Sequence, residues 1–392
     1  MIPYGRQSIS AADIEAVVEV LKSDFLTQGP VVPAFEEAFA RQTGAEYGVA
    51  MNSATSALHL ACRALGVGPG DSVWTSPLTF VASANAALYC GADVDFVDVD
   101  ERTYNICPQR LAEQLDRAAQ AGTLPKVIIP VHLAGQSCDM AAIHAATSRH
   151  GVRIIEDASH AIGGSYRSEP VGRCRYSDVT VFSFHPVKIV TTGEGGMAMT
   201  NDRELAELMR LDRTHGITRD PAQLQRDDGE PWYYEQQRLG FNYRMTDISA
   251  ALGLSQLRRV DEFIARRREI ASVYDAAFAA LPVKTPWQHP DTASAWHLYI
   301  IRIDAQRTAS SHRAVFDALR EAGIGVNLHY IPVYLQPYYR ELGFRPGHCP
   351  NAEAYYAEAI SLPIFPGLAP SDQERVINTV SDVLSPSKQD VR

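Results

Sequence analysis

The chain has 392 residues, of which 46% are hydrophobic, and a formal net charge of -10 at pH 7. A chain of this size buries a large core, and we expect two lobes rather than several independent modules. The acidic balance argues against a nucleic-acid surface. The sequence has no run of about 18 apolar residues and no apolar segment behind a charged start, so we expect a cytoplasmic protein that binds no membrane.

The six cysteines are scattered along the chain, with no C-x-x-C pair and no zinc-like spacing. They are Cys62, Cys90, Cys107, Cys138, Cys174 and Cys349. We expect reduced, structural thiols rather than disulfides or metal ligands.

Two helices are predicted at the start of the chain. Ser10 and Asp13 precede apolar residues at helical spacing, which predicts a capped amphipathic helix. A second helix is expected over 33–43, ending at Gly44.

From residue 47 onward, short apolar strands alternate with helices. Strands are expected at 47–51, 73–75, 94–97, 127–131, 152–156 and 179–184, and helices at 55–65, 80–89 and 140–150. This alternation predicts a mostly parallel, doubly wound sheet flanked by helices. Ligands of such sheets bind beyond the carboxyl ends of the strands, so site residues are expected just after strands.

A long helical pattern after Asp247 is expected to join the two lobes. Beyond it, a strand at 297–303 and helices at 310–322, 351–360 and 371–384 predict a smaller α+β lobe. We therefore divide the chain into a large domain, residues 1–250, and a spine helix with a small domain, residues 251–392.

Two segments that follow strands carry groups suited to a charged ligand. Residues 52–56 open a helix whose free amides and hydroxyls suit a phosphate, although Ser53 or Thr55 alone is explained equally well as a helix cap. Asp157 ends an apolar strand, where a desolvated carboxylate needs a cation such as a protonated pyridine nitrogen. The alternatives are that it caps the next helix or pairs with an arginine.

Lys188 follows another apolar strand and precedes a glycine-rich stretch, residues 191–196. Desolvation there would lower the pKa of the lysine amine and make it a Schiff-base nucleophile. The alternatives are a solvated surface lysine and a plain turn, and the stretch is not a P-loop because G-x-x-x-x-G-K-[ST] is absent. Residues 240–247 alone indicate only a Thr246 helix cap and two polar loop residues, Asn242 and Arg244.

Taken together and in order, these motifs resemble the DegT-type sugar-nucleotide aminotransferases, fold type I enzymes that depend on pyridoxal 5'-phosphate (PLP). The resemblance covers about residues 3–384, and its markers are Leu26-Thr27-Gln28-Gly29, Asn52-Ser53-Ala54-Thr55, Thr79-Phe80-Val81-Ala82, Glu156-Asp157-Ala158-Ser159-His160, Ser183-Phe184-His185-Pro186-Val187-Lys188 and Gly240-Phe241-Asn242-Tyr243-Arg244. It implies a large domain with a mostly parallel seven-stranded sheet, a smaller C-terminal α+β domain, and a homodimer with shared sites.

The resemblance also implies which residues act in catalysis and bind the cofactor. Lys188 would hold PLP as a Schiff base and later move a proton, Asp157 would keep the ring nitrogen protonated, and His160 would hydrogen-bond the ring hydroxyl or orient Asp157. The remaining cofactor-binding residues would be Phe80, stacked on the ring, and Ala54, Thr55, Ser183 and the partner's Asn242 at the phosphate. The cofactor would alternate with pyridoxamine 5'-phosphate. Because Lys188 is intact, transamination is favoured over the dehydratase branch, which has histidine there.

The substrate class rests on a narrower resemblance. Ile2-Pro3-Tyr4, residues 21–30 and Asn327-Leu328-His329-Tyr330 look most like the aminotransferases of the pseudaminic acid pathway. The implied sugar-nucleotide site is lined by Tyr4, Phe25, Leu26, Thr27, His185, Asn327, His329 and Tyr330. In the implied reaction, L-glutamate aminates UDP-2-acetamido-2,6-dideoxy-β-L-arabino-hex-4-ulose to UDP-4-amino-4,6-dideoxy-N-acetyl-β-L-altrosamine, for a cell-surface glycan. Alternatively, His329 and Tyr330 only pack the small lobe.

Two rival functions stay open. One is an aminotransferase for another dTDP-, GDP- or UDP-linked keto sugar. The other is a non-catalytic regulator with the same fold, against which the acidic charge and the absence of a helix-turn-helix or arginine-rich arm argue.

Overall fold

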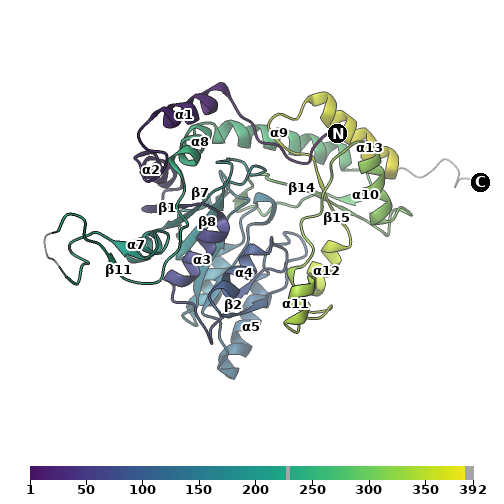
Figure 1. Ribbon diagram of the computed structural model, residues 1–392. Helices are drawn as coiled ribbons and strands as arrows, with labels where there is room; N and C mark the ends of the chain where they lie inside the picture. The colour runs from purple at the N-terminus through teal and green to yellow at the C-terminus, as the bar shows by residue number, and fades with distance from the viewer. Residues whose placement is uncertain (227–229, 385–392) are drawn as a thin grey trace, which may run out of the picture.

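The computed structural model describes residues 1–226 and 230–384. Its large lobe is built on a seven-stranded sheet with strand order β1-β9-β8-β5-β4-β2-β3 (Figure 1). The strands are β1 (Tyr47–Met51), β2 (Ser72–Thr75), β3 (Asp93–Phe96), β4 (Val127–Ile129), β5 (Arg153–Asp157), β8 (Val179–Ser183) and β9 (Gly196–Thr200). In this sheet β9 pairs antiparallel with β1 and β8, whereas the other pairs are parallel. The predicted mostly parallel sheet is confirmed.

Helices cover both faces of this sheet. They include α3 (Ala54–Ala64), α4 (Ala82–Tyr89), α5 (Pro108–Ala121), α6 (Met140–Ser148) and α7 (Arg203–Asp212). Consecutive strand residues enter different cores: Ile155 packs with α3 and α4, and Ile154 packs with α5 and α6. Burial on both faces explains why the strands are continuous apolar runs. The sequence analysis did not predict β9, α5 or α7, because β9 follows the glycine turn and the two helices are largely polar.

The two N-terminal helices pack against the start of the predicted spine. Ser10 and Asp13 form the capping box of α1 (Ala11–Lys22), and Gly44 ends α2 (Val31–Thr43) with a φ of 76°. Both helices contact α8 (Asp247–Leu257) (Figure 1). The predicted single spine is in fact two helices, α8 and α9 (Val260–Phe278), because the chain leaves helical geometry at Arg259.

Helix α9 joins the cores of the two lobes. Its first turns pack in a large-lobe core and its last turns pack with the small-lobe sheet. That sheet has the order β12-β14-β15, with β12 (Val283–Lys284), β14 (Tyr299–Ile303) and β15 (Ala359–Leu362). The small-lobe helices include α10 (His312–Glu321), α11 (Pro337–Glu341), α12 (Pro350–Tyr356) and α13 (Pro370–Leu384).

One predicted helix of the small lobe is partly wrong. The helix expected over 351–360 ends at Tyr356, and the following apolar residues form β15, which pairs with β14. The start of the chain also belongs to this lobe, because Ile2 bridges to Ile324 and the Tyr4 carbonyl accepts from the Ile364 amide. The domain division at residue 250 stays a prediction.

Short strands complete the described fold. A three-stranded sheet contains β6 (Ser165–Tyr166), β7 (Glu169–Pro170) and β13 (Thr292–Ala293). The strands β10 (Ile217–Thr218) and β11 (Glu235–Gln236) pair at the base of a hairpin that projects from the large lobe (Figure 1). All six cysteines are free. Within the described ranges, we find no helix with the length and apolar character needed to cross a membrane.

Candidate active site

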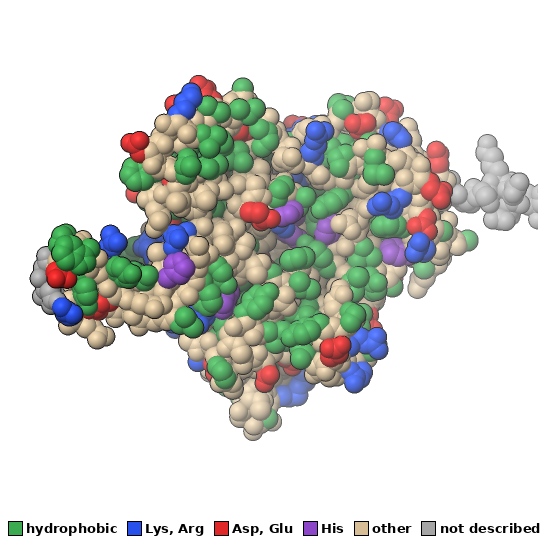
Figure 2. All heavy atoms as spheres, viewed as in Figure 1, with side chains coloured by type: hydrophobic (Ala, Val, Ile, Leu, Met, Phe, Trp, Pro, Cys, Tyr) green, Lys and Arg blue, Asp and Glu red, His purple; other side chains and the backbone are tan. Residues whose placement is uncertain are grey.

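A cavity of about 940 Å³ opens where β1, β5 and β8 end, and residues of both lobes line it. In the space-filling view, histidine side chains gather in a hollow near the middle of this face (Figure 2). The predicted site residues in its wall are Tyr4, Ala54, Thr55, Phe80, Asp157, His160, Ser183, His185, Lys188, Asn327, His329 and Tyr330. The volume suits a cofactor together with a small substrate.

The start of α3 forms an anion cradle in this wall. Ser53 is the helix cap, because its Oγ accepts from the Ser56 amide at 3.1 Å. The amides of Ala54 and Thr55 lie in the first turn, where N–H groups have no partner within the helix. An added Cβ on Gly196 would collide with the Ala54 amide, so glycine allows β9 to begin directly against the cradle. The first-turn amides therefore remain for an anionic ligand.

Asp157 ends β5 with its carboxylate in the cavity wall, where it is 5% exposed. Ser83 Oγ donates to Asp157 Oδ2 at 2.6 Å, and the Ser159 amide donates to Oδ1 at 3.1 Å. Both partners are uncharged donors. They stabilise the carboxylate but leave its charge for a cationic ligand.

Lys188 follows β8 in the same wall. Burial lowers the pKa of its amine to about 8, and the charge of Asp157 opposes this shift. An amine with this pKa is partly unprotonated near neutral pH, which a nucleophile or a general base requires.

His160 connects the two lobes at the cavity. Its Nδ1 accepts from the Ala134 amide at 3.3 Å, and its Nε2 lies 3.1 Å from the Tyr330 hydroxyl. Burial lowers the pKa of His160 well below its ordinary value, with further contributions from Lys188 and His329. In the neutral ring, Nδ1 is an acceptor and Nε2–H therefore donates to Tyr330. These contacts engage both ring nitrogens, and Asp157 takes its hydrogen bonds from Ser83 and Ser159 instead.

The small lobe supplies an uncharged polar wall. The rings of Tyr4 and His329 lie 5.3 Å apart, and His329 Nδ1 is 2.8 Å from Ser361 Oγ. Burial lowers the pKa of His329 to about 3, as does the charge of Lys188. Asn327 Nδ2 lies 3.4 Å from His329 Nε2. This wall offers hydrogen bonds without adding charge.

Four predicted site residues lie away from the cavity of the single chain. Phe25 is 54% exposed and Leu26 47% exposed, and Thr27 bridges to Thr246 at the start of α8. Asn242 is also exposed, and its carbonyl lies 3.5 Å from Asn52 Nδ2. Their roles stay predictions, and only that of Asn242 involves a second protomer.

Three residues at the site were assigned no role from the sequence. Ser83 and Thr79 are buried at the start of α4, and Thr79 Oγ1 lies 2.7 Å from Ser83 Oγ. The His297 ring centroid lies 4.4 Å from that of His160, and burial lowers the pKa of His297 well below its ordinary value. In the sequence, these residues are visible only as polar residues in or next to an apolar helix or at the start of a strand. That pattern does not show whether such a residue is buried at the site.

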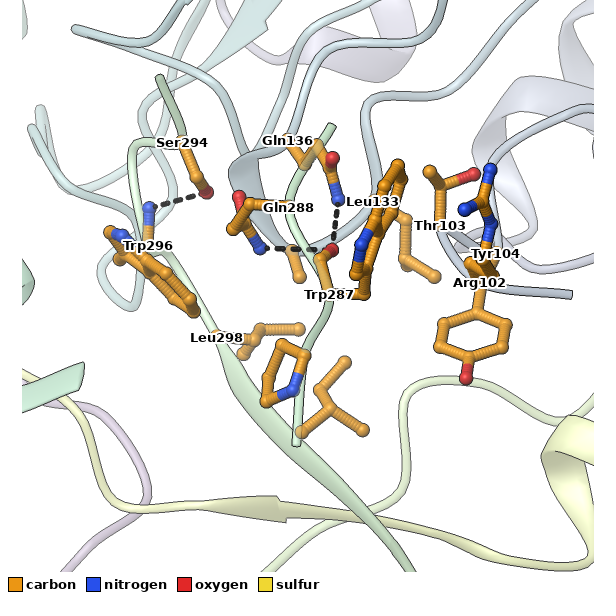
Figure 3. A pocket seen from close by; sticks show the side chains of 13 residues that line it. Arg102, Thr103, Tyr104, Leu133, Gln136, Trp287, Gln288, Ser294, Trp296 and Leu298 are labelled. Carbon is orange, nitrogen blue, oxygen red and sulfur yellow. Dashed lines mark hydrogen bonds between the residues drawn. The ribbon is translucent and has the colours of Figure 1, made fainter. Parts of the chain in front are cut away.

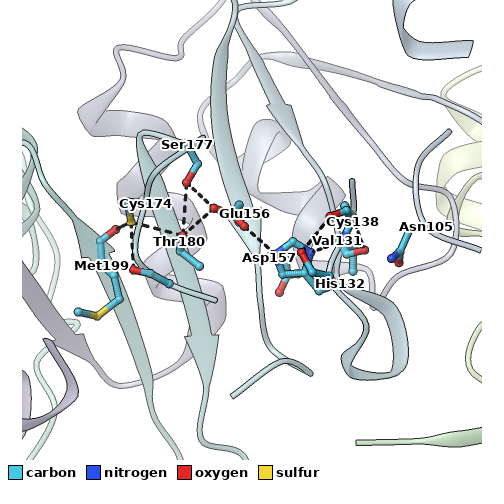
Figure 4. A network of polar contacts seen from close by, with 12 residues as sticks. Asn105, Val131, His132, Cys138, Glu156, Asp157, Cys174, Ser177, Thr180 and Met199 are labelled. Carbon is cyan, nitrogen blue, oxygen red and sulfur yellow. Dashed lines mark hydrogen bonds and ion pairs between the residues drawn. The ribbon is translucent and has the colours of Figure 1, made fainter. Parts of the chain in front are cut away.

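The opposite side of β5 carries a second buried carboxylate, Glu156. His132 Nε2 lies 2.7 Å from Glu156 Oε2, and the hydroxyls of Ser177 and Thr180 donate to Oε1 (Figure 4). Burial alone would raise the pKa of Glu156, but the hydrogen bond and charge of His132 together with the two hydroxyl donors outweigh burial and lower it. The Cys138 amide donates to His132 Nδ1. This hydrogen bond closes the loop that follows β4 and contains Ala134.

A small second cavity lies on the far side of that loop. It measures about 30 Å³ and is lined by Leu133, Trp287 and Arg102, whose guanidinium carbon lies 4.2 Å from the Trp287 ring centroid (Figure 3). Gln136 Nε2 donates to the Trp287 carbonyl across it. This volume holds about one water molecule, so it is no substrate site.

Comparison with known proteins agrees with this geometry. The sequence profile of the DegT/DnrJ/EryC1/StrS aminotransferase family matches residues 7–381. The chain is 41% identical over 388 residues to the spore coat polysaccharide biosynthesis protein SpsC of Bacillus subtilis (strain 168). The matched region covers 98% of this chain and 97% of that protein.

Two solved structures have the same fold along nearly the whole chain. The PMP form of Spr1654 from Streptococcus pneumoniae matches with a TM-score of 0.89 and 31% identity, covering 98% of this chain and 99% of that chain. Helicobacter pylori PseC, an aminotransferase involved in the biosynthesis of pseudoaminic acid, matches with a TM-score of 0.88 and 31% identity, with coverage of 98% and 99%.

Proposed function

The chain belongs to the DegT/DnrJ/EryC1/StrS aminotransferase family, and from this premise we propose that it transfers an amino group from L-glutamate to a nucleotide-linked keto sugar. It is an aminotransferase, and PLP is its cofactor. The observation that carries the proposal is the pairing, in one cavity, of a buried carboxylate whose hydrogen-bond donors are uncharged and a lysine amine with a lowered pKa.

The residues in the cavity wall fit PLP by charge and shape. The first-turn amides of α3, with Thr55 and Ser183, would hold the phosphate. Asp157 would accept from the protonated ring nitrogen, and Phe80, which is 62% exposed at the cavity, offers an aromatic face for the ring. Lys188 would hold the aldehyde carbon covalently.

When bound, PLP supplies a protonated ring that takes up the electron pair left by the departing α proton of the amino donor. Lys188 Nζ would remove that proton in the first half-reaction, and in the second half-reaction it would deliver a proton to the carbon of the acceptor that carried the keto oxygen. Ser83 and Ser159 would hold the carboxylate of Asp157 in place to accept from the ring nitrogen. His160 stays neutral and fixes Tyr330 at the cavity wall.

For the acceptor, we propose UDP-2-acetamido-2,6-dideoxy-β-L-arabino-hex-4-ulose, with UDP-4-amino-4,6-dideoxy-N-acetyl-β-L-altrosamine as product. The similarity to PseC, an aminotransferase involved in the biosynthesis of pseudoaminic acid, and to SpsC, a spore coat polysaccharide biosynthesis protein, supports a sugar for a cell-surface glycan. The uncharged wall of Tyr4, Asn327 and His329 suits hydroxyl and amide groups of such a sugar. The proposal includes the cytoplasmic location expected from the sequence.

We also propose a homodimer with shared sites. Large apolar side chains lie exposed near α1 and on the projecting hairpin, among them Phe25, Leu26 and Trp232. Large contiguous patches of exposed apolar side chains commonly mark an interface. Asn242 lies at the surface beside Asn52, from which it would reach the phosphate of the neighbouring protomer.

Turnover of a panel of nucleotide-linked keto sugars with L-glutamate tests the proposal, with 2-oxoglutarate and amino sugar as the measured products. We expect the UDP-linked 4-keto-6-deoxy sugar named above to react fastest. Faster turnover of a dTDP or GDP sugar would replace the acceptor but keep the class. A bound PLP absorbance that L-glutamate leaves unchanged, with no sugar converted, would favour the non-catalytic regulator.

A further inference from the structure

A chain of three hydroxyl and carboxyl groups runs from the start of α4 to the end of β5. Thr79 Oγ1 lies 2.7 Å from Ser83 Oγ, and Ser83 Oγ lies 2.6 Å from Asp157 Oδ2. Ser83 has no exposed surface, and Thr79 is 2% exposed. Both hydroxyls are therefore shielded from bulk water.

The hydrogen bonds of this chain have a fixed direction. An ionised carboxylate only accepts, so the single proton of Ser83 points to Asp157. Ser83 Oγ is then the acceptor for the hydroxyl of Thr79. Hydrogen bonds in series polarise one another, and a donor to an ionised group contributes more than a donor to a neutral one.

We propose that Ser83 is a positioning residue of the transamination reaction, which acts through Asp157 and is supported by Thr79. This inference rests on the proposed role of Asp157 at the ring nitrogen. Ser83 fixes the direction of the carboxylate. Without this donor, the carboxylate of Asp157 is free to turn away from the position in which it would meet the ring nitrogen.

The test begins with Ser83→Ala. We expect kcat to fall roughly ten- to hundredfold, the range of a hydrogen bond to a charged group. KM for both substrates should change by less than about threefold, because Ser83 does not line the cavity. Titration of the cofactor-free protein with PLP should show affinity reduced about two- to tenfold.

A matched pair of isosteric changes separates this role from loss of packing. Thr79→Val and Thr75→Val each remove one buried hydroxyl, but Thr75 Oγ1 donates to the Ile129 carbonyl in the sheet and not to the chain of groups at Asp157. We expect Thr79→Val to lower kcat about two- to tenfold. Thr75→Val should lower stability while kcat and PLP affinity stay within about twofold of the original protein.

A double-mutant cycle with Asp157→Asn decides whether Ser83 acts through Asp157. We expect Ser83→Ala to lower kcat by less than about threefold when Asp157 is already Asn. The inference is overturned if the full effect of Ser83→Ala persists in that background, or if Ser83→Ala alone leaves kcat and PLP affinity unchanged. Near-normal activity of Asp157→Asn itself would instead overturn the proposed function at the ring nitrogen.

Discussion

The two sides of strand β5 carry neighbouring carboxylates with different surroundings. Glu156 and Asp157 are both 5% exposed, and consecutive residues of a strand point to opposite faces. On one face, Glu156 is enclosed by His132, Ser177 and Thr180 (Figure 4). On the other face, Asp157 has two uncharged donors and lines the large cavity.

This difference distinguishes a buried carboxylate that stabilises the fold from one that faces a ligand cavity. A buried charge costs free energy unless its partners are supplied. The partners of Glu156, including a histidine that carries charge when protonated, come from its own chain, so its network is complete when the chain folds. Asp157 faces a cavity that Lys188 also lines, and in the proposed function a cationic ligand completes its surroundings.

The largest expected effect comes from removing the charge that faces the cavity. In Asp157→Asn the amide keeps the shape of the side chain but does not hold a proton on the ring nitrogen. We expect kcat to fall about 10³- to 10⁴-fold, as for other catalytic carboxylates changed to amides. PLP should remain bound, as measured by its absorbance after gel filtration. A kcat within tenfold of the original would contradict the assigned role.

The matched change on the opposite face should alter stability instead. In Glu156→Gln an amide NH₂ replaces an oxygen that accepts hydrogen bonds, so we expect a loss of about 3 kcal/mol in the free energy of unfolding. Urea unfolding measures this loss, and kcat at a temperature where the variant is folded should stay within about threefold. A selective loss of kcat with normal stability would show that the two faces do not differ as proposed.

The pH dependence of that loss has a definite sign. The folded state lowers the pKa of Glu156, through His132 and two hydroxyls against the opposing effect of burial. The stabilisation is therefore complete above the unfolded pKa, about 4.3, and disappears as the pH falls through the lower folded pKa. The stability difference between the original protein and Glu156→Gln should be constant near neutral pH and shrink in acid.

The sequence was sufficient to predict some of the residues that lie near Asp157 on one face of β5. It was insufficient to predict the partners of Glu156 on the other face. Asp157 and Lys188 were predicted near each other because parallel strands end at one edge of the sheet and a charged residue after an apolar run is visible in the sequence, and both line the cavity. Ser183, which was taken from the family resemblance, lines it as well. Glu156 was visible as well, but its histidine lies 24 residues away and only the fold brings the two together. Ser83 was hidden because an expected helix does not reveal which of its polar residues is buried.

Three other residues predicted at the site do not line the cavity. Phe25, Leu26 and Asn242 were taken from the family resemblance, and they lie at the surface of the protomer.

Helix α12 was predicted too long because the apolar residues that follow it fit both a helix and a buried strand. Pairing with β14 decides between the two.

The lowered pKa of Lys188 gives the next largest expected effect. Burial brings the pKa of its amine to about 8, whereas an exposed lysine has a pKa of about 10.4. In the cofactor-free protein, reductive methylation by formaldehyde should therefore favour Lys188 over the exposed Lys22 at pH 7. The ratio of the two rates should fall about a hundredfold between pH 7 and pH 10.5. Peptide mass spectrometry measures both sites in one sample, and a constant ratio would show that the amine is not perturbed.

The smallest expected effect concerns the part of the site that the single chain leaves open. A hydrogen bond to a charged phosphate contributes about 1.5 to 3 kcal/mol, so Asn242→Ala should weaken PLP binding about ten- to hundredfold without unfolding the exposed loop. Mixing Lys188→Ala with Asn242→Ala protomers at limiting PLP tests where this bond is made. If sites are shared, each mixed dimer has one site with both changes and one with neither, so activity rises above that of either variant alone. If each protomer completes its own site, every site keeps one change and mixing adds nothing, which would refute the shared site while leaving the contrast between the two faces of β5 intact.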